Sequence, residues 1–400
     1  MGFIAPRLDV IKPSPSMAVT ARAIEMRAAG IDVISLSAGE PDFPTPAHVV
    51  EAAYAAMRRG ETRYTAVDGT VALKKAVADK FRRENGLDYR LPEITVAGGA
   101  KQIIYNALLA TLAPGDEVIV PAPYWVSYID IVLLGEGKPV VVPCGEELGF
   151  KLTPSALRAA ITGRTKWLLM NTPSNPTGAV YGRDELAALA AVLLDHPHVH
   201  VLTDDIYEHI LFDGRAFHTI ASVEPRLKER TLTVNGVSKA YAMTGWRIGY
   251  AGGPEPLIRA MATVQSQSTS NPSSISQAAT IAALDGPQDF LAPRALEFQA
   301  RRDRALELLR AIPGLSCRTP EGAFYLYPDC SALIGRRRPD GSVVGSDDDL
   351  SLYLLDHARV AVVQGSAYGL SPHFRISIAT SMDLIEKAIG RIAEAVQALR

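Results

Sequence analysis

The stretch "NGVSKAYAMTGWRIG", residues 235–249, places a lysine and an arginine where the end of a buried strand would normally carry neither. Lys239 stands among small and apolar residues, and Arg247 follows it closely. The preceding run "TLTVNG" is rich in residues that favour strands, and it predicts a buried strand that ends just before the lysine. Burying an unpaired charge is costly, so the rest of the chain has to supply a reason for both cations.

The composition predicts a folded protein whose partners are small molecules. The chain has 400 residues, of which 48% are hydrophobic, and its formal net charge is −2. These values argue against disorder and against broad electrostatic attraction to nucleic acid or an acidic membrane. The 3 cysteines form no CxxC pair, which disfavours a disulfide framework or a zinc knuckle. With no apolar run of about 20 residues, we expect a soluble protein of the reducing cytoplasm.

Short apolar runs alternate with helical patterns along most of the chain. The runs predict a mostly parallel α/β sheet that is covered by helices on both faces: "EITVAGG", "DEVIVPAP", "TKWLLMN", "VHVLTDD" and "TLTVNG". Residues 99–112 and 183–194 are candidate helices between them. Beyond the sheet, "LEFQARRDRALELLRAI" predicts a long helix, "GAFYLYPD" a strand, and residues 381–400 a helix with one apolar face.

These elements predict a division of the chain into two domains. We expect residues 1–35 to form an N-terminal arm and part of a small domain, and residues 36–290 to form a large domain around the sheet. Residues 291–400 should complete the small α+β domain.

Polar residues follow several of the predicted strands, and in an open α/β sheet ligands bind where parallel strands end. Gly99, Ala100 and Lys101 open a helix after the first run, and the free N–H groups of such a helix can hold a phosphate. Later runs are followed by an amide, a carboxylate, a phenol and an amine, which belong to Asn175, Asp204, Tyr207 and Lys239.

Pyridoxal phosphate is a ligand that would use all of these groups. It needs a lysine for attachment, an acidic partner for its ring nitrogen and an anion-binding seat for its phosphate. Lys239 is the candidate attachment point, Asp204 the candidate ring partner, and Arg247 completes the phosphate seat. Asn175 and Tyr207 could donate to the ring oxygen, and Trp125 offers a flat face for stacking.

The order of the motifs resembles that of the fold-type I aminotransferases, in the bacterial aspartate aminotransferase branch that also contains prephenate and aromatic aminotransferases. The motifs span nearly the whole chain: "SLSAGEPDFPTP", "YTAVDG", "GGAKQ", "NTPSNPTG", "TDDIYE", "NGVSKAYAMTGWRIGY" and "FRISIATS". The resemblance implies a class I enzyme that depends on pyridoxal 5′-phosphate. It implies ping-pong transamination, with aspartate and 2-oxoglutarate first and aromatic amino acids or prephenate as the alternative.

The resemblance also implies roles for individual residues. Lys239 would carry the cofactor and act as general base, while Asp204 and Tyr207 would assist it. Arg375 would clamp the substrate α-carboxylate, with Gly39, Trp125 and Asn175 beside it. Lys101 and Ser16 would hold a second carboxylate.

The resemblance also assigns the phosphate contacts, to Gly99, Ala100, Lys101 and Arg247. Tyr64 would reach the phosphate of a neighbouring subunit, so the resemblance implies a homodimer with shared active sites. Some relatives carry a phosphate-binding serine where this chain has Gly236, and Ser238 would take its place.

Structural alternatives remain open for several of these residues. Asp204 could cap a helix that begins at Ile206, although Asp205 is the better candidate for such a cap. Trp125 and Tyr207 could be ordinary core aromatics, and Arg375 could pair with a buried carboxylate. A lyase on the same fold would share the central residues, whereas a transcription regulator would need an added DNA-binding region.

Two further stretches suggest binding only weakly. "HPHVH" contains His196, His198 and His200, but Pro197 interrupts it and no acidic or thiol partner stands nearby, so we predict no metal site. "GRRRPDGSVVGSDDD" is typical of a solvated loop with a Pro-Asp-Gly turn before an acidic helix start.

Overall fold

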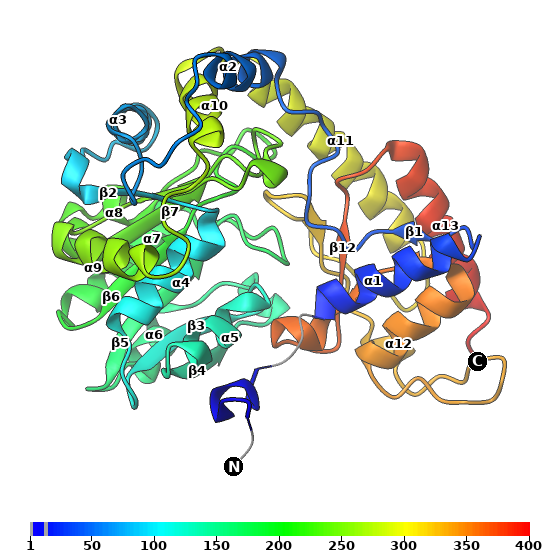
Figure 1. Ribbon diagram of the computed structural model, residues 1–400. Helices are drawn as coiled ribbons and strands as arrows, with labels where there is room; N and C mark the ends of the chain where they lie inside the picture. Colours follow the sequence, from blue (N-terminus) through cyan, green and yellow to red (C-terminus); the bar gives the residue numbers. More distant parts are fainter. Residues whose placement is uncertain (1–2, 12–14) are drawn as a thin grey trace.

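The computed structural model describes residues 3–11 and 15–400. Figure 1 shows two lobes, with α11 (Leu291–Arg310) running from the top of the large lobe into the smaller one. The large lobe contains the main sheet, and the smaller lobe contains the C-terminal helices. The domain boundaries predicted at residues 35 and 290 stay a prediction.

The large lobe is built on a seven-stranded sheet in the order β2-β8-β7-β6-β5-β3-β4. Strand β8 is antiparallel to both of its neighbours, and the other strand pairs are parallel. All five predicted runs are strands. Strands β4 and β8 were not predicted. The sequence of β8, "GYAG", contains two glycines and no branched residue, so it lacks the pattern of a strand. The strands are β2 (Ile94–Ala97), β3 (Glu117–Ala122), β4 (Lys138–Pro143), β5 (Thr165–Asn171), β6 (His200–Asp204), β7 (Thr231–Gly236) and β8 (Gly249–Gly252).

Helices pack around this sheet, and both predicted helices are present to within one residue at each end. They are α2 (Ala47–Arg58), α3 (Val71–Lys80), α4 (Ala100–Thr111), α5 (Ser127–Leu134), α6 (Pro154–Ala160), α7 (Arg183–Leu194), α8 (Ile220–Val223), α9 (Glu255–Ser266) and α10 (Ser274–Asp285). Helix α4 begins directly after Gly99, whose φ of +105° is strained for any residue with a side chain. This glycine turns the chain sharply from β2 into α4 and aims the helix N-terminus at the end of the sheet.

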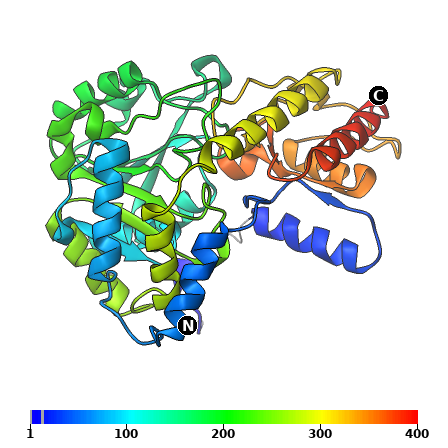
Figure 2. The ribbon, with the colours of Figure 1, turned by 90° about the horizontal axis from the view of Figure 1, so that it is seen from above.

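The smaller lobe joins the two ends of the chain. Strand β1 (Ile34–Ser35) pairs in parallel with β10 (Val360–Ala361), and β12 (Phe374–Ser377) lies between β11 (Val363–Gln364) and β9 (Tyr325–Leu326). Helices α1 (Pro15–Ala28), α12 (Asp347–Tyr353) and α13 (Met382–Gln397) belong to the same lobe. Figure 2 shows α1 in blue and α13 in red on this side of the molecule.

Sequence and structure agree less closely in this lobe. The predicted strand "GAFYLYPD" shortens to Tyr325–Leu326, although the predicted helices α11 and α13 are confirmed. Helix α13 is capped by Ser381 and buries the predicted apolar face. Among the described residues, no helix is both long and apolar enough to cross a membrane.

A buried ionic network holds the turn that follows β6. Lys80, at the end of α3, is completely buried and contacts the Glu208 carboxylate. Its Nζ also donates to Asn85 Oδ1 at 2.7 Å, while Asn85 Nδ2 donates to Glu208 Oε2 at 2.6 Å. These bonds compensate the cost of burying both charges. They tie α3 to the turn that carries Tyr207, and so fix that turn below the site described next.

Candidate active site

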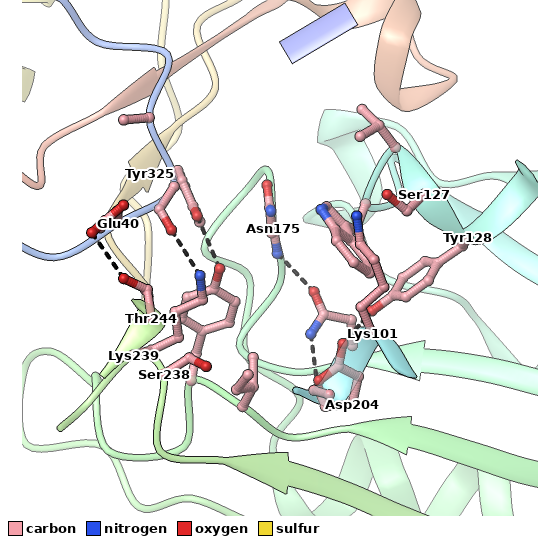
Figure 3. Close-up of a pocket in the computed structure, with 18 of the residues that line it drawn as sticks. Glu40, Lys101, Ser127, Tyr128, Asn175, Asp204, Ser238, Lys239, Thr244 and Tyr325 are labelled. Carbon is pink, nitrogen blue, oxygen red and sulfur yellow. Dashed lines mark hydrogen bonds between the residues drawn. The ribbon is translucent and has the colours of Figure 1, made fainter. Parts of the chain in front are cut away.

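A cavity of about 430 Å³ opens at the strand ends of the large lobe and is closed on its other side by the smaller lobe. Figure 3 shows Asp204, Ser238 and Lys239 reaching it from the sheet, with Tyr325 facing them. Residues from both lobes line it. The predicted site residues among them are Gly39, Ala100, Lys101, Trp125, Asn175, Asp204, Tyr207, Ser238, Lys239, Arg247 and Arg375.

Lys239 lies in the loop just after β7, and its amine is held in the cavity. Its Nζ donates to the Gly39 carbonyl at 2.7 Å and lies 5.8 Å from the centre of the Tyr207 ring. Burial, and then the positive charge of Arg375, lower the pKa of Lys239 to about 8, although the Asp204 carboxylate acts in the opposite direction. The neutral amine, which can attack a carbonyl or accept a proton, is therefore accessible close to neutral pH.

Asp204 is the last residue of β6, and its carboxylate is buried under the same cavity. Tyr128 donates its hydroxyl to Asp204 Oδ2 at 2.7 Å, whereas Oδ1 has no hydrogen-bond partner among the described residues. Burial raises the pKa of Asp204 to about 6, and the Tyr128 hydrogen bond opposes that rise. A buried carboxylate oxygen without a donor is costly, so this atom is suited to a ligand with an N–H group.

The helix-capping alternative for this segment is wrong. No helix begins at Ile206, because the chain after β6 forms a turn instead. Asp205, expected to be the better cap, is fully buried and accepts a hydrogen bond of 2.5 Å from the Thr203 hydroxyl. Asp205 therefore serves the interior of the large lobe, and Asp204 is left to face the cavity.

Positive charge gathers at the start of α4. Arg247 donates from Nη2 to the Gly98 carbonyl at 3.2 Å, and a Cβ atom on Gly99 would lie 2.5 Å from the same nitrogen. Lys101 lines the same cavity with its Nζ 4.7 Å from the centre of the Trp125 ring. Burial and the nearby Arg247 charge both lower the pKa of Lys101. Two cations beside the free N–H groups of a helix form a seat for an anion.

Ser238 offers a hydroxyl group to the cavity near the anion seat, whereas position 236 is a glycine. A Cβ atom on Gly236 would lie 3.1 Å from the Ile248 carbonyl and 3.2 Å from the Gly249 Cα atom, because β7 packs tightly on β8 there. Ser238 is nearly buried and lines the cavity, and its replacement of a serine at position 236 stays a prediction.

Arg375 reaches the cavity from β12 of the smaller lobe. Its Nη1 donates to Asn175 Oδ1 at 3.0 Å, and its Nη2 donates to the Ser37 carbonyl. The guanidinium carbon lies 4.5 Å from the centre of the Tyr325 ring, and Nε has no partner among the described residues. These contacts hold the guanidinium plane in the cavity. Among the described residues, no carboxylate forms a salt bridge with the buried Arg375 charge.

Comparison with known proteins agrees with this geometry. The family described as "Aminotransferase class I and II" matches residues 31–392. The chain is 60% identical over 391 residues to the aspartate aminotransferase of Rhizobium meliloti (strain 1021), covering 98% of this chain and 95% of that protein. This chain belongs to the class I and II aminotransferases.

Two further relatives of this aminotransferase show which branch of the family it resembles. It is 57% identical over 392 residues to the aspartate/prephenate aminotransferase of Cereibacter sphaeroides, covering 98% of both chains. The solved structure of the Thermus thermophilus aspartate aminotransferase with maleate superposes with a TM-score of 0.92 at 44% identity, covering 99% of this chain and 100% of that one. The predicted resemblance is confirmed, and so is the fold, an α/β fold of type I with a mostly parallel central sheet.

Two tyrosines of the aminotransferase cavity were not predicted from the sequence. Tyr325 shares a hydrogen bond of 2.9 Å between its hydroxyl and that of Tyr207, and it also lies under Arg375. Tyr128 holds Asp204 from α5. The helical spacing of Tyr128 from Trp125 was a usable signal, since their rings meet edge to face with centres 5.3 Å apart.

Tyr207 and Trp125 were predicted as site residues, with ordinary core packing as the alternative. Tyr207 and Trp125 both pack against the main hydrophobic core while they line the cavity, so the core and site interpretations hold together. Among the described residues, the His and acidic groups close enough to share a metal ion do not include His196, His198 or His200.

Three predicted residues are not among those that line the described cavity. The first, Gly99, lies directly before α4 and beside the Arg247 guanidinium. The Tyr64 side chain is 91% exposed and contributes nothing to the walls of the cavity. Ser16 is in α1, and its side chain lies outside the described part of the chain. The roles of all three residues stay predictions.

The lowered pKa of Lys239 can be measured through its reactivity. A lysine amine reacts with formaldehyde and a hydride donor only when it is neutral, so methylation of Lys239 in the cofactor-free protein should rise with pH and level off above about pH 8. Arg375→Met should move the midpoint upward because it removes a repelling charge, and Asp204→Asn should move it downward. Peptide mass spectrometry across the pH range gives the curve, with exposed Lys75 in the same sample as reference. A Lys239 curve that coincides with that of Lys75 would contradict the assignment.

Proposed function

We propose that this aminotransferase uses pyridoxal 5′-phosphate to exchange amino groups between aspartate and 2-oxoglutarate in a ping-pong reaction. The observation that carries the proposal is the content of one cavity. It holds the Lys239 amine with its lowered pKa, the buried Asp204 carboxylate with one unpaired oxygen, and the anion seat at the start of α4. The names of the relatives support the choice of aspartate.

The residues present fit this cofactor. The unpaired Asp204 Oδ1 would accept from its ring nitrogen, and the N-terminus of α4 with Arg247 and Ser238 would hold its phosphate. The free amide nitrogen of Asn175 and the hydroxyl of Tyr207 would donate to the ring oxygen, and Trp125 offers an aromatic face. When bound, pyridoxal 5′-phosphate supplies a carbonyl that condenses with amines and a ring that accepts electrons.

Lys239 would carry the cofactor at rest and act as the general base once a substrate amine takes its place. Its Nζ would then move the proton of the substrate Cα, which requires a neutral amine near working pH. Burial and the Arg375 charge supply that condition. The Gly39 carbonyl accepts a hydrogen bond from the amine and keeps it within the cavity, beside the Tyr207 ring.

The cavity offers separate cations for the two carboxylates of a dicarboxylic substrate. Arg375 would bind the α-carboxylate, because a guanidinium presents parallel donors that match a carboxylate. Lys101, with Ser16, would bind the second one. The Thermus relative was solved with maleate, which is itself a dicarboxylate. Aromatic amino acids or prephenate are the second candidates, favoured by the Trp125 ring beneath Lys101 and by the Cereibacter relative.

We infer that the active enzyme is a homodimer in which Tyr64 completes the site of the partner. Tyr64 is 91% exposed, and apolar side chains on α2, Tyr54 and Met57, are 58% and 45% exposed. Exposed aromatic and apolar side chains of this kind are available to an interface with a second copy of the chain. Three buried free cysteines fit a reducing compartment, and we infer a cytoplasmic enzyme.

The proposed reaction is tested by amino transfer from aspartate to 2-oxoglutarate, together with borohydride reduction that should leave a stable cofactor adduct on Lys239. Asp204→Ala should keep much of the bound cofactor yet lose about a thousandfold in rate, or roughly 4 kcal/mol, because an unprotonated ring is a poor electron acceptor. Asp205→Asn is the neighbouring control and should lose far less. An adduct on Lys101, or an Asp204→Ala rate within tenfold of wild type, would contradict the proposed roles.

The proposed role of Lys101 predicts a selective loss. Lys101→Met keeps an apolar stem over Trp125 but removes the charge, so kcat/KM for aspartate and glutamate should fall about ten- to a hundredfold, or about 1.5–3 kcal/mol. Phenylalanine, which has no second carboxylate, should be affected much less. Steady-state kinetics with the three amino donors measures this difference, and equal losses would show that Lys101 serves the phosphate alone.

Sharing of the site between subunits predicts complementation. Lys239→Ala and Tyr64→Ala homodimers should both be impaired, whereas a mixed dimer of the two chains rebuilds one complete site from Lys239 of one chain and Tyr64 of the other. Activity of purified mixed dimers, counted per intact Lys239, should therefore exceed that of the Tyr64→Ala homodimer. Equal activity would mean that Tyr64 serves its own chain.

A further inference from the structure

Three metal-ligating side chains meet where the edge of the main sheet faces the smaller lobe. Glu146 follows β4 in a short 3-10 helix, Glu146–Leu148, while Asp329 follows β9 and His373 immediately precedes β12. One ligand atom from each lies within 4.8 Å of the others. The sequence analysis predicted no metal site, and no spacing motif could have shown this one, because the three residues come from segments far apart in the chain.

His373 is held in this cluster without a hydrogen bond. The residue is 5% exposed, and neither ring nitrogen has a partner among the described residues. Its ring is stacked on that of Tyr327, with centres 4.8 Å apart and an angle of 5°, and Phe150 packs against it edge to face. Packing therefore fixes the direction of its nitrogens, and a buried imidazole without a partner costs free energy unless a ligand fills the gap.

The gap has the size of a coordinated ion. His373 Nε2 and Asp329 Oδ2 are 3.8 Å apart, which is too far for a hydrogen bond. A zinc ion lies about 2.0–2.2 Å from an imidazole nitrogen and from a carboxylate oxygen, so two such ligands stand at nearly this separation. Glu146 is the third ligand in reach.

The charges around the gap favour a cation. The Glu146 and Asp329 carboxylates stand close together beside the His373 ring, so their negative charges repel each other. Asp347 adds a further negative charge near His373, while Arg318 is the positive group that acts on Glu146. A divalent ion would relieve the repulsion between the two carboxylates and satisfy the imidazole at once.

We propose that Glu146, Asp329 and His373 form a binding site for a divalent transition-metal ion, with zinc as the expected occupant, that ties the segment after β4 to the smaller lobe. One imidazole with two carboxylates suits zinc, whereas calcium and magnesium prefer oxygen ligands alone. The site stands apart from the cavity that holds Lys239, and its existence does not depend on the cofactor chemistry.

A second group of the same residue types provides an internal control. Glu84, Glu208 and His209 also lie close together, but the Lys80 ammonium contacts Glu208 and lies 3.5 Å from Glu84. His209 Nε2 is already hydrogen-bonded to Glu84 Oε2 at 3.0 Å. A lysine fills the place of an ion there, so this group should not bind one.

Isothermal titration of the full chain with zinc, in a buffer free of chelators and phosphate, tests the proposal. Wild type should bind one ion per chain that His373→Asn, Asp329→Asn and Glu146→Gln each weaken at least about tenfold, since even the loss of a supporting residue around a metal costs ten- to a hundredfold. The matched controls His209→Asn and Glu147→Gln should bind as wild type does.

A second readout separates specific binding from loss of folding. Zinc should raise the thermal midpoint of wild type and of the controls but not that of Asp329→Asn, whose side chain is partly exposed and so tolerates the change. Cobalt(II) should give visible d–d absorption that the same substitution removes. Absence of stoichiometric binding in wild type, wild-type affinity in the three ligand variants, or loss of binding in His209→Asn would each overturn the proposal.

Discussion

The active-site arrangement depends on the burial of one amine beside one carboxylate. Lys239 and Asp204 stand at the ends of adjacent strands, β7 and β6, where Asp204 is buried and Lys239 is half-buried. Exclusion of water lowers the pKa of the amine to about 8 and raises that of the carboxyl to about 6, so both groups can change protonation state near neutral pH. The Gly39 carbonyl and the Tyr128 hydroxyl then fix where each group points. Neither property would survive on an open surface, where solvent would screen the charges.

Both lobes are required to exclude water from the cavity. The sheet supplies the amine and the carboxylate, but Arg375 and Tyr325 close the cavity from β12 and β9. Arg375 bridges to Asn175 in the large lobe and to the Ser37 carbonyl in the segment between the lobes. A substrate carboxylate that pairs with Arg375 would therefore act on a residue that already contacts both parts of the molecule, and its binding energy could be used to set their relative position. The buried Lys80 and Glu208 pair holds the opposite wall, since it anchors the turn that carries Tyr207.

The sequence predicted the parts of the site that follow directly from strand ends. Lys239, Asp204 and Asn175 were found because each follows a continuous apolar run, and the topology rule brings such positions together. Tyr325 was missed because its strand is only two residues long and its alternating aromatics resemble ordinary packing. Tyr128 acts through Asp204, a contact that no local pattern encodes. The alternative of a helix that begins at Ile206 fails because Asp205 bonds inward to Thr203, so tertiary contacts decide between a turn and a helix after the same strand. Strand β4 was also missed, although its sequence "KPVVVP" keeps an apolar run, and the structure places it at the sheet edge with its residues partly exposed.

Under the proposed function, the position of Lys101 would give a physical reason why one scaffold could serve two kinds of amino donor. Its ammonium lies over the Trp125 ring, so the charge is stabilised by an aromatic face when no second carboxylate is present. A dicarboxylic substrate would replace that contact with a charged hydrogen bond, whereas an aromatic side chain would use the apolar surface of Trp125 instead. Burial and Arg247 both lower the pKa of Lys101, which makes its charge costly to keep unpaired and so strengthens the preference for an anionic partner. Selectivity would then depend on the balance between an ion pair and a stacked ring at a single wall of the cavity, while Lys239, Asp204 and Arg375 remain the same for every substrate.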